Sequence, residues 1–129
     1  MEEFEGQEER IDKFKKAQRL MFINDVERYH SQPMPMGVLE FMDLFGVEPT
    51  DEDKDILTQV FMKNYMSTDI ESTEAINKLI DKWGLDWLQL FLEHNEEKEE
   101  YELCAILRDT INAGTDQLKS WMRGIQYQE

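Results

Sequence analysis

The chain has one cysteine, three prolines and six glycines among its 129 residues, and these scarcities exclude several classes of protein. A lone cysteine, Cys104, cannot form an intramolecular disulfide and is typical of the reducing cytosol. No apolar run approaches the roughly 20 residues that span a bilayer, and the first residues lack the basic and apolar segments of a signal peptide. We therefore expect a cytoplasmic protein that does not contact membranes.

Basic residues are scarce as well: 14 lysines and arginines stand against 29 acidic residues, so the formal net charge is −15. Most of the acidic excess lies after residue 30, whereas residues 1–30 are nearly balanced. A surface of this charge repels phosphate backbones and attracts basic partners, and salt weakens the attraction. The composition therefore predicts a protein partner and no direct contact with nucleic acid.

Segments that alternate with period two are also missing, which excludes an extended sheet and favours an all-α fold. Apolar residues instead recur at steps of three, four or seven throughout the chain. With 40% apolar and 11% aromatic residues, the chain has enough material for one core. We expect a single compact domain over residues 1–129, a bundle of six to seven helices with no sheet, whose oligomeric state the sequence leaves open.

A long first helix is predicted over residues 1–30. It must end before the proline loop at residues 31–35, because proline removes an amide donor and disfavours helix in the residue before it. The helical core then occupies residues 36–129. The apolar positions that we expect the first helix to bury are Ile11, Phe14, Met21, Phe22, Val26 and Tyr29.

The other helix boundaries are predicted from capping residues and glycines. The expected helix starts are Met36, a cap at Thr50, a capping box at Thr68-Asp69-Ile70-Glu71, a cap at Asp86, Glu97, and a cap at Thr115. The expected stops are Gly46, Gly84, Gly114 and Gly124, with a turn at His94-Asn95. Residues 86–113 would then form an antiparallel helical hairpin.

The acidic run after Thr50 has the opening spacing of a calcium-binding EF-hand loop, with aspartates at positions 51, 53 and 55. The sixth loop position should be glycine and the twelfth a bidentate glutamate, but these positions are Ile56 and Met62. We therefore interpret the run as an acidic first turn, where the helix dipole favours negative charge.

No other pattern predicts catalysis, a metal or a cofactor. Glu27-x-x-His30 has the ligand spacing of di-iron carboxylate helices, but such sites need a second pair and two more glutamates. Cys104 lies between apolar neighbours in a predicted helix, which is typical of a small buried residue rather than a nucleophile. We therefore expect a protein that is not an enzyme and needs no cofactor.

A basic cluster on the first helix has the composition of a nucleic-acid contact. Acidic residues precede it at spacings that suit i, i+3 and i, i+4 ion pairs, so we interpret it as a solvated, ion-paired helix face. The basic residues are Lys13, Lys15, Lys16 and Arg19, and the acidic ones are Glu5, Glu8, Glu9 and Asp12.

One stretch resembles a known family signature. The residues Glu99-x-Tyr101-Glu102-x-Cys104-Ala105-x-Leu107-Arg108-Asp109-x-Ile111 resemble the second half of the UVR motif. That motif is a helical hairpin of bacterial excision-repair nuclease subunits and of some Clp-type ATPases and their partners. The resemblance implies protein–protein docking through the hairpin, with Tyr101, Arg108 and Asp109 as contact residues. The competing interpretation is an ordinary antiparallel helix pair of the core.

Apolar residues around the proline loop form a second candidate docking surface. Phe41-Met42-Asp43-Leu44-Phe45 resembles the short peptide by which many proteins bind the bacterial sliding clamp, and methionines adapt to irregular partners. The candidate contact residues are Met34, Met36, Leu44 and Phe45. The alternative is that these side chains pack in the core.

These features lead to two hypotheses for the function. The first is a non-enzymatic interaction module, an adaptor or regulator that docks into a basic or apolar groove on a larger intracellular machine. The alternative is an acidic mimic of nucleic acid, such as a phage-encoded inhibitor or regulator of a polymerase or nuclease, which needs carboxylates in rows. The acidic face would consist of Asp51, Glu52, Asp53, Asp55, Glu93, Glu96, Glu97, Glu99, Glu100 and Glu102.

Overall fold

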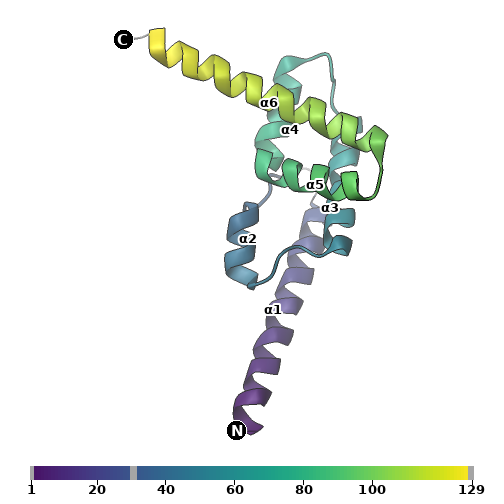
Figure 1. Ribbon diagram of the computed structural model, residues 1–129, viewed down its shortest axis with the longest axis vertical. Helices are drawn as coiled ribbons and strands as arrows, with labels where there is room; N and C mark the ends of the chain where they lie inside the picture. Colours follow the sequence, from purple (N-terminus) through teal and green to yellow (C-terminus); the bar gives the residue numbers. More distant parts are fainter. Residues whose placement is uncertain (1, 30–31, 128–129) are drawn as a thin grey trace.

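The computed structural model describes residues 2–29 and 32–127, and this part of the chain folds into six α-helices without a strand (Figure 1). The predicted all-α fold of six to seven helices without a sheet is confirmed. The helices are α1 (Glu2–Arg28), α2 (Val38–Phe45), α3 (Asp51–Met66), α4 (Thr73–Trp83), α5 (Leu85–Glu97) and α6 (Tyr101–Tyr127). None of the described helices is long and apolar enough to cross a membrane.

Aromatic side chains fill the core, where the C-terminal half of α1 and the helix α2 meet α3, α4 and α5. Trp87 and Phe91 of α5 lie fully buried at its centre. Phe91 packs edge-on against Trp83 with ring centroids 5.6 Å apart, and Trp87 packs edge-on against Phe41 at 5.8 Å. Edge-to-face pairs of this kind add stability beyond the burial of their area.

The predicted boundaries on both sides of the loop between α2 and α3 are confirmed. The Thr50 hydroxyl accepts a hydrogen bond from the Asp53 amide at 3.1 Å, and the Asp53 carboxylate accepts one from the Thr50 amide at 3.0 Å. This reciprocal capping box satisfies two amides at the start of α3. Gly46 ends α2 in the left-handed region, at φ 70°, which glycine adopts at little cost.

The capping box predicted at residues 68–71 is wrong, and α4 begins further along the chain. Thr68 lies just past the end of α3, where its hydroxyl donates to the carbonyl of Asn64 at 2.7 Å. The hydroxyl of Ser72 caps α4 instead, accepting from the amide of Ala75 at 3.2 Å. A threonine hydroxyl can either bond back to a helix or cap the next one, and Thr68 does the first.

Asp86 is not the N-cap of α5, contrary to the prediction, because that position belongs to Gly84. Asp86 lies in the first turn, where its Oδ1 accepts a hydrogen bond from the amide of Trp87 at 2.9 Å. Its Oδ2 accepts one from the amide of Val38 at 2.8 Å and so caps the start of α2. The indole of the next residue, Trp87, donates to the carbonyl of Met36 at 2.8 Å. These two contacts tie α2 to α5, and α2 therefore begins at Val38 rather than at Met36.

The predicted stop at Gly114 is also wrong, because this glycine lies inside α6. A Cβ atom at this position would lie 2.8 Å from Cδ2 of Leu85 and 3.2 Å from Cγ2 of Ile80. Glycine is therefore used here for the close approach of neighbouring helices rather than to end a helix. Thr115 caps no seventh helix, and its hydroxyl donates to the carbonyl of Ile111 at 3.0 Å.

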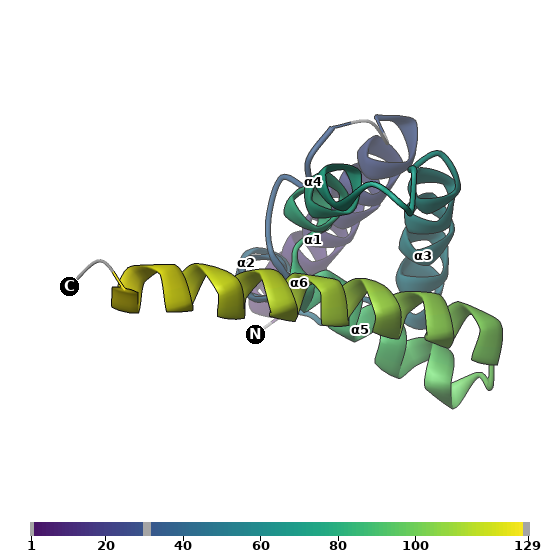
Figure 2. The same cartoon turned by 90° about the horizontal axis from the view of Figure 1, so that it is seen from above.

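The turn between α5 and α6 lies later than predicted. His94 and Asn95 belong to α5 and are buried, and the turn falls at residues 98–100, where Glu99 has φ 60°. α6 also continues past Gly124, the last predicted stop. The result is an antiparallel hairpin of α5 and the first part of α6 (Figure 2).

Both terminal helices extend beyond the core (Figures 1 and 2). The stripe predicted to be buried along α1 is buried only near its end, at Phe22 and Val26. Several large apolar side chains of these two helices are exposed: Ile11, Phe14, Leu20 and Met21 of α1, and Leu118 and Met122 of α6. Tyr29, which follows α1, is exposed as well. Apolar periodicity places residues on one helix face but does not reveal what covers that face. We call residues 8–21 the α1 arm.

Candidate interaction surfaces

The two acidic segments of the sequence meet at one end of the molecule, where the start of α3 lies beside the end of α5. His94 of α5 joins them: its Nε2 lies 2.7 Å from Oδ1 of Asp55, and its Nδ1 lies 3.7 Å from Oδ1 of Asp51. We call this region the acidic end. Its exposed or partly exposed carboxylates belong to Asp51, Glu52, Asp55, Glu93, Glu96, Glu97, Glu99, Glu100 and Glu102.

Two cationic side chains partly neutralise the acidic end. Nζ of Lys98 lies 2.8 Å from Oδ1 of Asp55, and Nη2 of Arg108 lies 3.0 Å from Oε1 of Glu96. Hydrogen bonds from Lys98 and His94 lower the pKa of Asp55 and outweigh the opposing effect of burial. The bond to Asp55 also raises the pKa of Lys98. Most of the carboxylates nevertheless have no cationic partner among the described residues, so the end stays strongly negative.

Asp53 does not lie on the exposed acidic face. It is only 3% exposed, and its Oδ2 lies 3.2 Å from Nε of Arg19 in an ion pair that is largely shielded from water. The buried Nε makes no hydrogen bond in this contact. Asp53 therefore anchors α1 to α3 instead of presenting its charge to a partner.

The residues implied by the UVR resemblance lie on the first part of α6. Tyr101 is 69% exposed and begins the helix beside the acidic turn. Arg108 bridges to Glu96 of α5, and Asp109 is exposed. Cys104 is fully buried in the core, which confirms its interpretation as a small core residue. Tyr101 is thus the exposed large apolar side chain of the hairpin.

The apolar residues around the proline loop do not form one exposed surface. Phe45 is 4% exposed and packs in the core, with its ring centroid 4.7 Å from that of Phe41. Met34 and Met36 are half-buried against the same core. Leu44 alone of the four candidates points outward, with 56% of its surface exposed.

The α1 arm does not form the ion pairs expected along its length. Among its described charged residues, Arg19 alone lies in an ion pair, and its partner is Asp53 of α3. Apart from Arg10, the acidic residues of the arm precede its basic residues, and the charge changes sign between Asp12 and Lys13.

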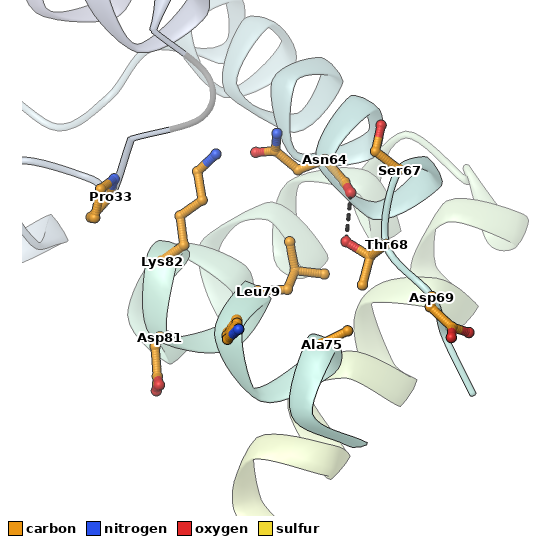
Figure 3. A pocket seen from close by; sticks show the side chains of 10 residues that line it. Pro33, Asn64, Ser67, Thr68, Asp69, Ala75, Leu79, Asp81 and Lys82 are labelled. Carbon is orange, nitrogen blue, oxygen red and sulfur yellow. Dashed lines mark hydrogen bonds between the residues drawn. The ribbon is translucent and has the colours of Figure 1, made fainter. Parts of the chain in front are cut away.

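An open pocket of 680 Å³ lies between the end of α3, the loop that follows it, and α4 (Figure 3). The hydroxyls of Ser67 and Thr68 donate to carbonyls of α3, and the amide oxygen of Asn64 accepts from the indole of Trp83 at 3.1 Å. Partial burial lowers the pKa of Lys82. The side-chain oxygens of Asn64, Ser67 and Thr68 are thus committed to the fold, and neither hydroxyl is paired with a base that would activate it as a nucleophile.

Two features of these surfaces are not predicted by the sequence. His94 joins α3 to α5 although its sequence context favours a turn, and nothing nearby in the chain indicates its distant partners. The exposure of the α1 arm is not predicted either, because its apolar residues recur with the same period as those of a buried helix face. The one available signal is the change of charge after Asp12.

The described residues contain no group of three or more His, Cys, Asp and Glu side chains placed to hold a metal ion. No family model, curated protein or solved structure matches the chain. Its function is therefore inferred from its own residues and geometry.

Proposed function

We propose that the protein is a non-enzymatic interaction module, an adaptor or regulator whose acidic end docks into a groove on a protein partner. The observation that supports this proposal is the meeting of two acidic segments, distant in sequence, beside the exposed ring of Tyr101. The partner is a component of a larger intracellular machine and carries a basic surface around an apolar recess.

Concentrated negative charge accelerates association with a basic partner, because the fields of neighbouring carboxylates add. Charge of this kind contributes less affinity as salt rises, so a stable complex also needs an apolar anchor. Tyr101 provides such an anchor, since exposed aromatic side chains that become buried dominate the binding energy of many interfaces. The carboxylates of the acidic end therefore determine which partner associates, and burial of the Tyr101 ring stabilises the complex.

The test compares two variants that change the net charge equally at different places. The acidic-end variant is Glu97→Lys, Glu100→Lys and Glu102→Lys, and the control variant is Glu27→Lys, Asp43→Lys and Glu71→Lys. Capture of a partner from lysate at low salt is expected to survive in the control variant and to be lost in the acidic-end variant. Tyr101→Ala is expected to weaken capture. Equal loss in both charge variants would show that net charge alone matters and would contradict docking at this end.

The same surface supports the alternative that the protein imitates nucleic acid. Carboxylates follow one another along the end of α5, the turn and the start of α6. Rows of negative charge like this one are what a protein groove that binds nucleic acid recognises in the phosphate backbone. A mimic would displace duplex DNA or RNA from its target, with an affinity that falls steeply as salt rises. Displacement that the acidic-end variant abolishes would favour the mimic, whereas capture without displacement would favour the adaptor.

A further inference from the structure

An exposed apolar stripe runs along the α1 arm. Ile11, Phe14 and Met21 are 53%, 63% and 65% exposed, and their spacings of three and seven residues place them on one side of the helix. α1 contacts the core further along the chain, in its last two turns, where Phe22, Ile23 and Val26 are buried. The described part of the chain therefore leaves this stripe open to a second molecule.

Charge changes sign along the same helix. Residues 2–12 contain six acidic residues and one arginine, whereas residues 13–19 contain three lysines, one arginine and no acidic residue. Two such helices attract each other when they run antiparallel, because the acidic half of each then faces the basic half of the other. When they run parallel, like charges face each other.

We infer that the α1 arm is a self-association surface on which a second copy of this chain docks in the antiparallel direction. A two-fold axis between residues 12 and 13 sets Ile11 opposite Phe14 of the second copy, and Phe14 opposite Ile11 of the second copy. The two most central exposed apolar residues of the arm thus cover each other. Met21 lies toward the body of the molecule, on the same stripe.

The flanking charges distinguish the two directions of pairing. In the antiparallel pair, Glu8 lies beside Lys15 of the second copy, and the contact occurs twice by symmetry. In a parallel pair, Arg10 would lie beside Lys15 and repel it. Lys15 is partly buried, with its ammonium close to Gly46 at the end of α2, so its charge lies where the arm meets α2.

This inference is independent of the proposed function, because it concerns the α1 arm and not the acidic end. The two surfaces would operate together, since a dimer carries two acidic ends. Two linked binding sites raise the apparent affinity for a partner that presents two matching sites.

Sedimentation of the full chain over a range of concentrations tests the inference. The wild-type mass is expected to rise from 15.5 kDa to twice that value as the concentration increases. The double variant Ile11→Glu with Phe14→Glu is expected to remain a monomer, because it places charges at the centre of the pair. Leu20→Glu is the matched control: Leu20 is also exposed but lies on the opposite side of the helix, so the dimer should persist.

Lys15→Glu tests the direction of pairing. For an antiparallel pair it is expected to weaken dimerisation by about tenfold, since both symmetric contacts become repulsive. Adding Glu8→Lys should restore the dimer. A parallel pair would instead be strengthened by Lys15→Glu, which would overturn the inference. A wild type that stays monomeric at every concentration, or a dimer that survives the Ile11 and Phe14 replacements or is lost in the Leu20 control, would also overturn it.

Discussion

Asp53→Ala is expected to destabilise the protein by about 3 kcal/mol, because Asp53 has two structural roles. Loss of the hydrogen bond that its carboxylate accepts from the Thr50 amide costs about 1 kcal/mol. Removing one partner from a fully buried ion pair costs about 3 to 5 kcal/mol, and we take about 2 kcal/mol for Arg19. The lower value applies because the Arg19 side chain keeps 12% exposure and its Nε makes no hydrogen bond. The melting temperature should fall by about 12 °C.

Asp53→Asn separates the two roles, because the amide oxygen can still accept a hydrogen bond from Thr50 while the charge is gone. Urea unfolding followed by circular dichroism gives the free energy of each variant. A double-mutant cycle with Arg19→Met is expected to give a coupling energy of about 2 kcal/mol between the two side chains. A coupling energy below about 0.5 kcal/mol, typical of a solvent-exposed pair, would refute this account of the anchor.

Phe91→Ala is expected to lower the free energy of unfolding by about 4 kcal/mol, because the ring is fully buried. Phe14→Ala on the α1 arm should change it by less than about 0.5 kcal/mol in dilute solution. Urea unfolding measures both free energies. The thiol of Cys104, fully buried, should react with iodoacetamide only after denaturant is added, and rapid labelling of the native protein would contradict its core placement. The folded-state pKa of Asp55 lies below its ordinary value of 3.8, so its stabilising contribution is present above that value and is lost as the pH falls through the lower folded pKa. Asp55→Asn should therefore be less stable than wild type at about pH 6 and should converge with it in strong acid, as measured by urea unfolding across pH.

Local hydrogen bonding explains which parts of the fold are predictable from the sequence. The capping box of Thr50 and Asp53 involves groups three residues apart, so its residue types suffice to predict it. Asp86 caps a helix that begins 48 residues earlier in the chain, and Gly114 is required by side chains of two other helices. The residues next to Asp86 and Gly114 in the sequence do not indicate these distant contacts. For that reason the predicted cap of α5 at Asp86 and the predicted helix end at Gly114 are both wrong.

The candidate surfaces show the same division between local composition and long-range placement. The sequence predicts each acidic segment of the acidic end, because charge is a property of the residues themselves. Their meeting depends on His94, whose partners Asp51 and Asp55 belong to another helix. In the α1 arm, the 3.6-residue period correctly predicts a helix but is identical for buried and exposed stripes, so the exposure of Phe14 is seen only in three dimensions.

α6 runs without interruption from the acidic end, past Gly114, to the projecting segment that carries Leu118 and Met122 (Figure 2). Its 27 residues span about 40 Å at a rise of 1.5 Å per residue. One molecule bound at Tyr101 and another bound along Met122 would be held at a fixed separation and a fixed rotation about one rigid axis. Deleting a single residue from this helix would turn its two ends relative to each other by about 100°. The number of residues in α6 therefore sets both the distance and the relative rotation between the surfaces at its two ends.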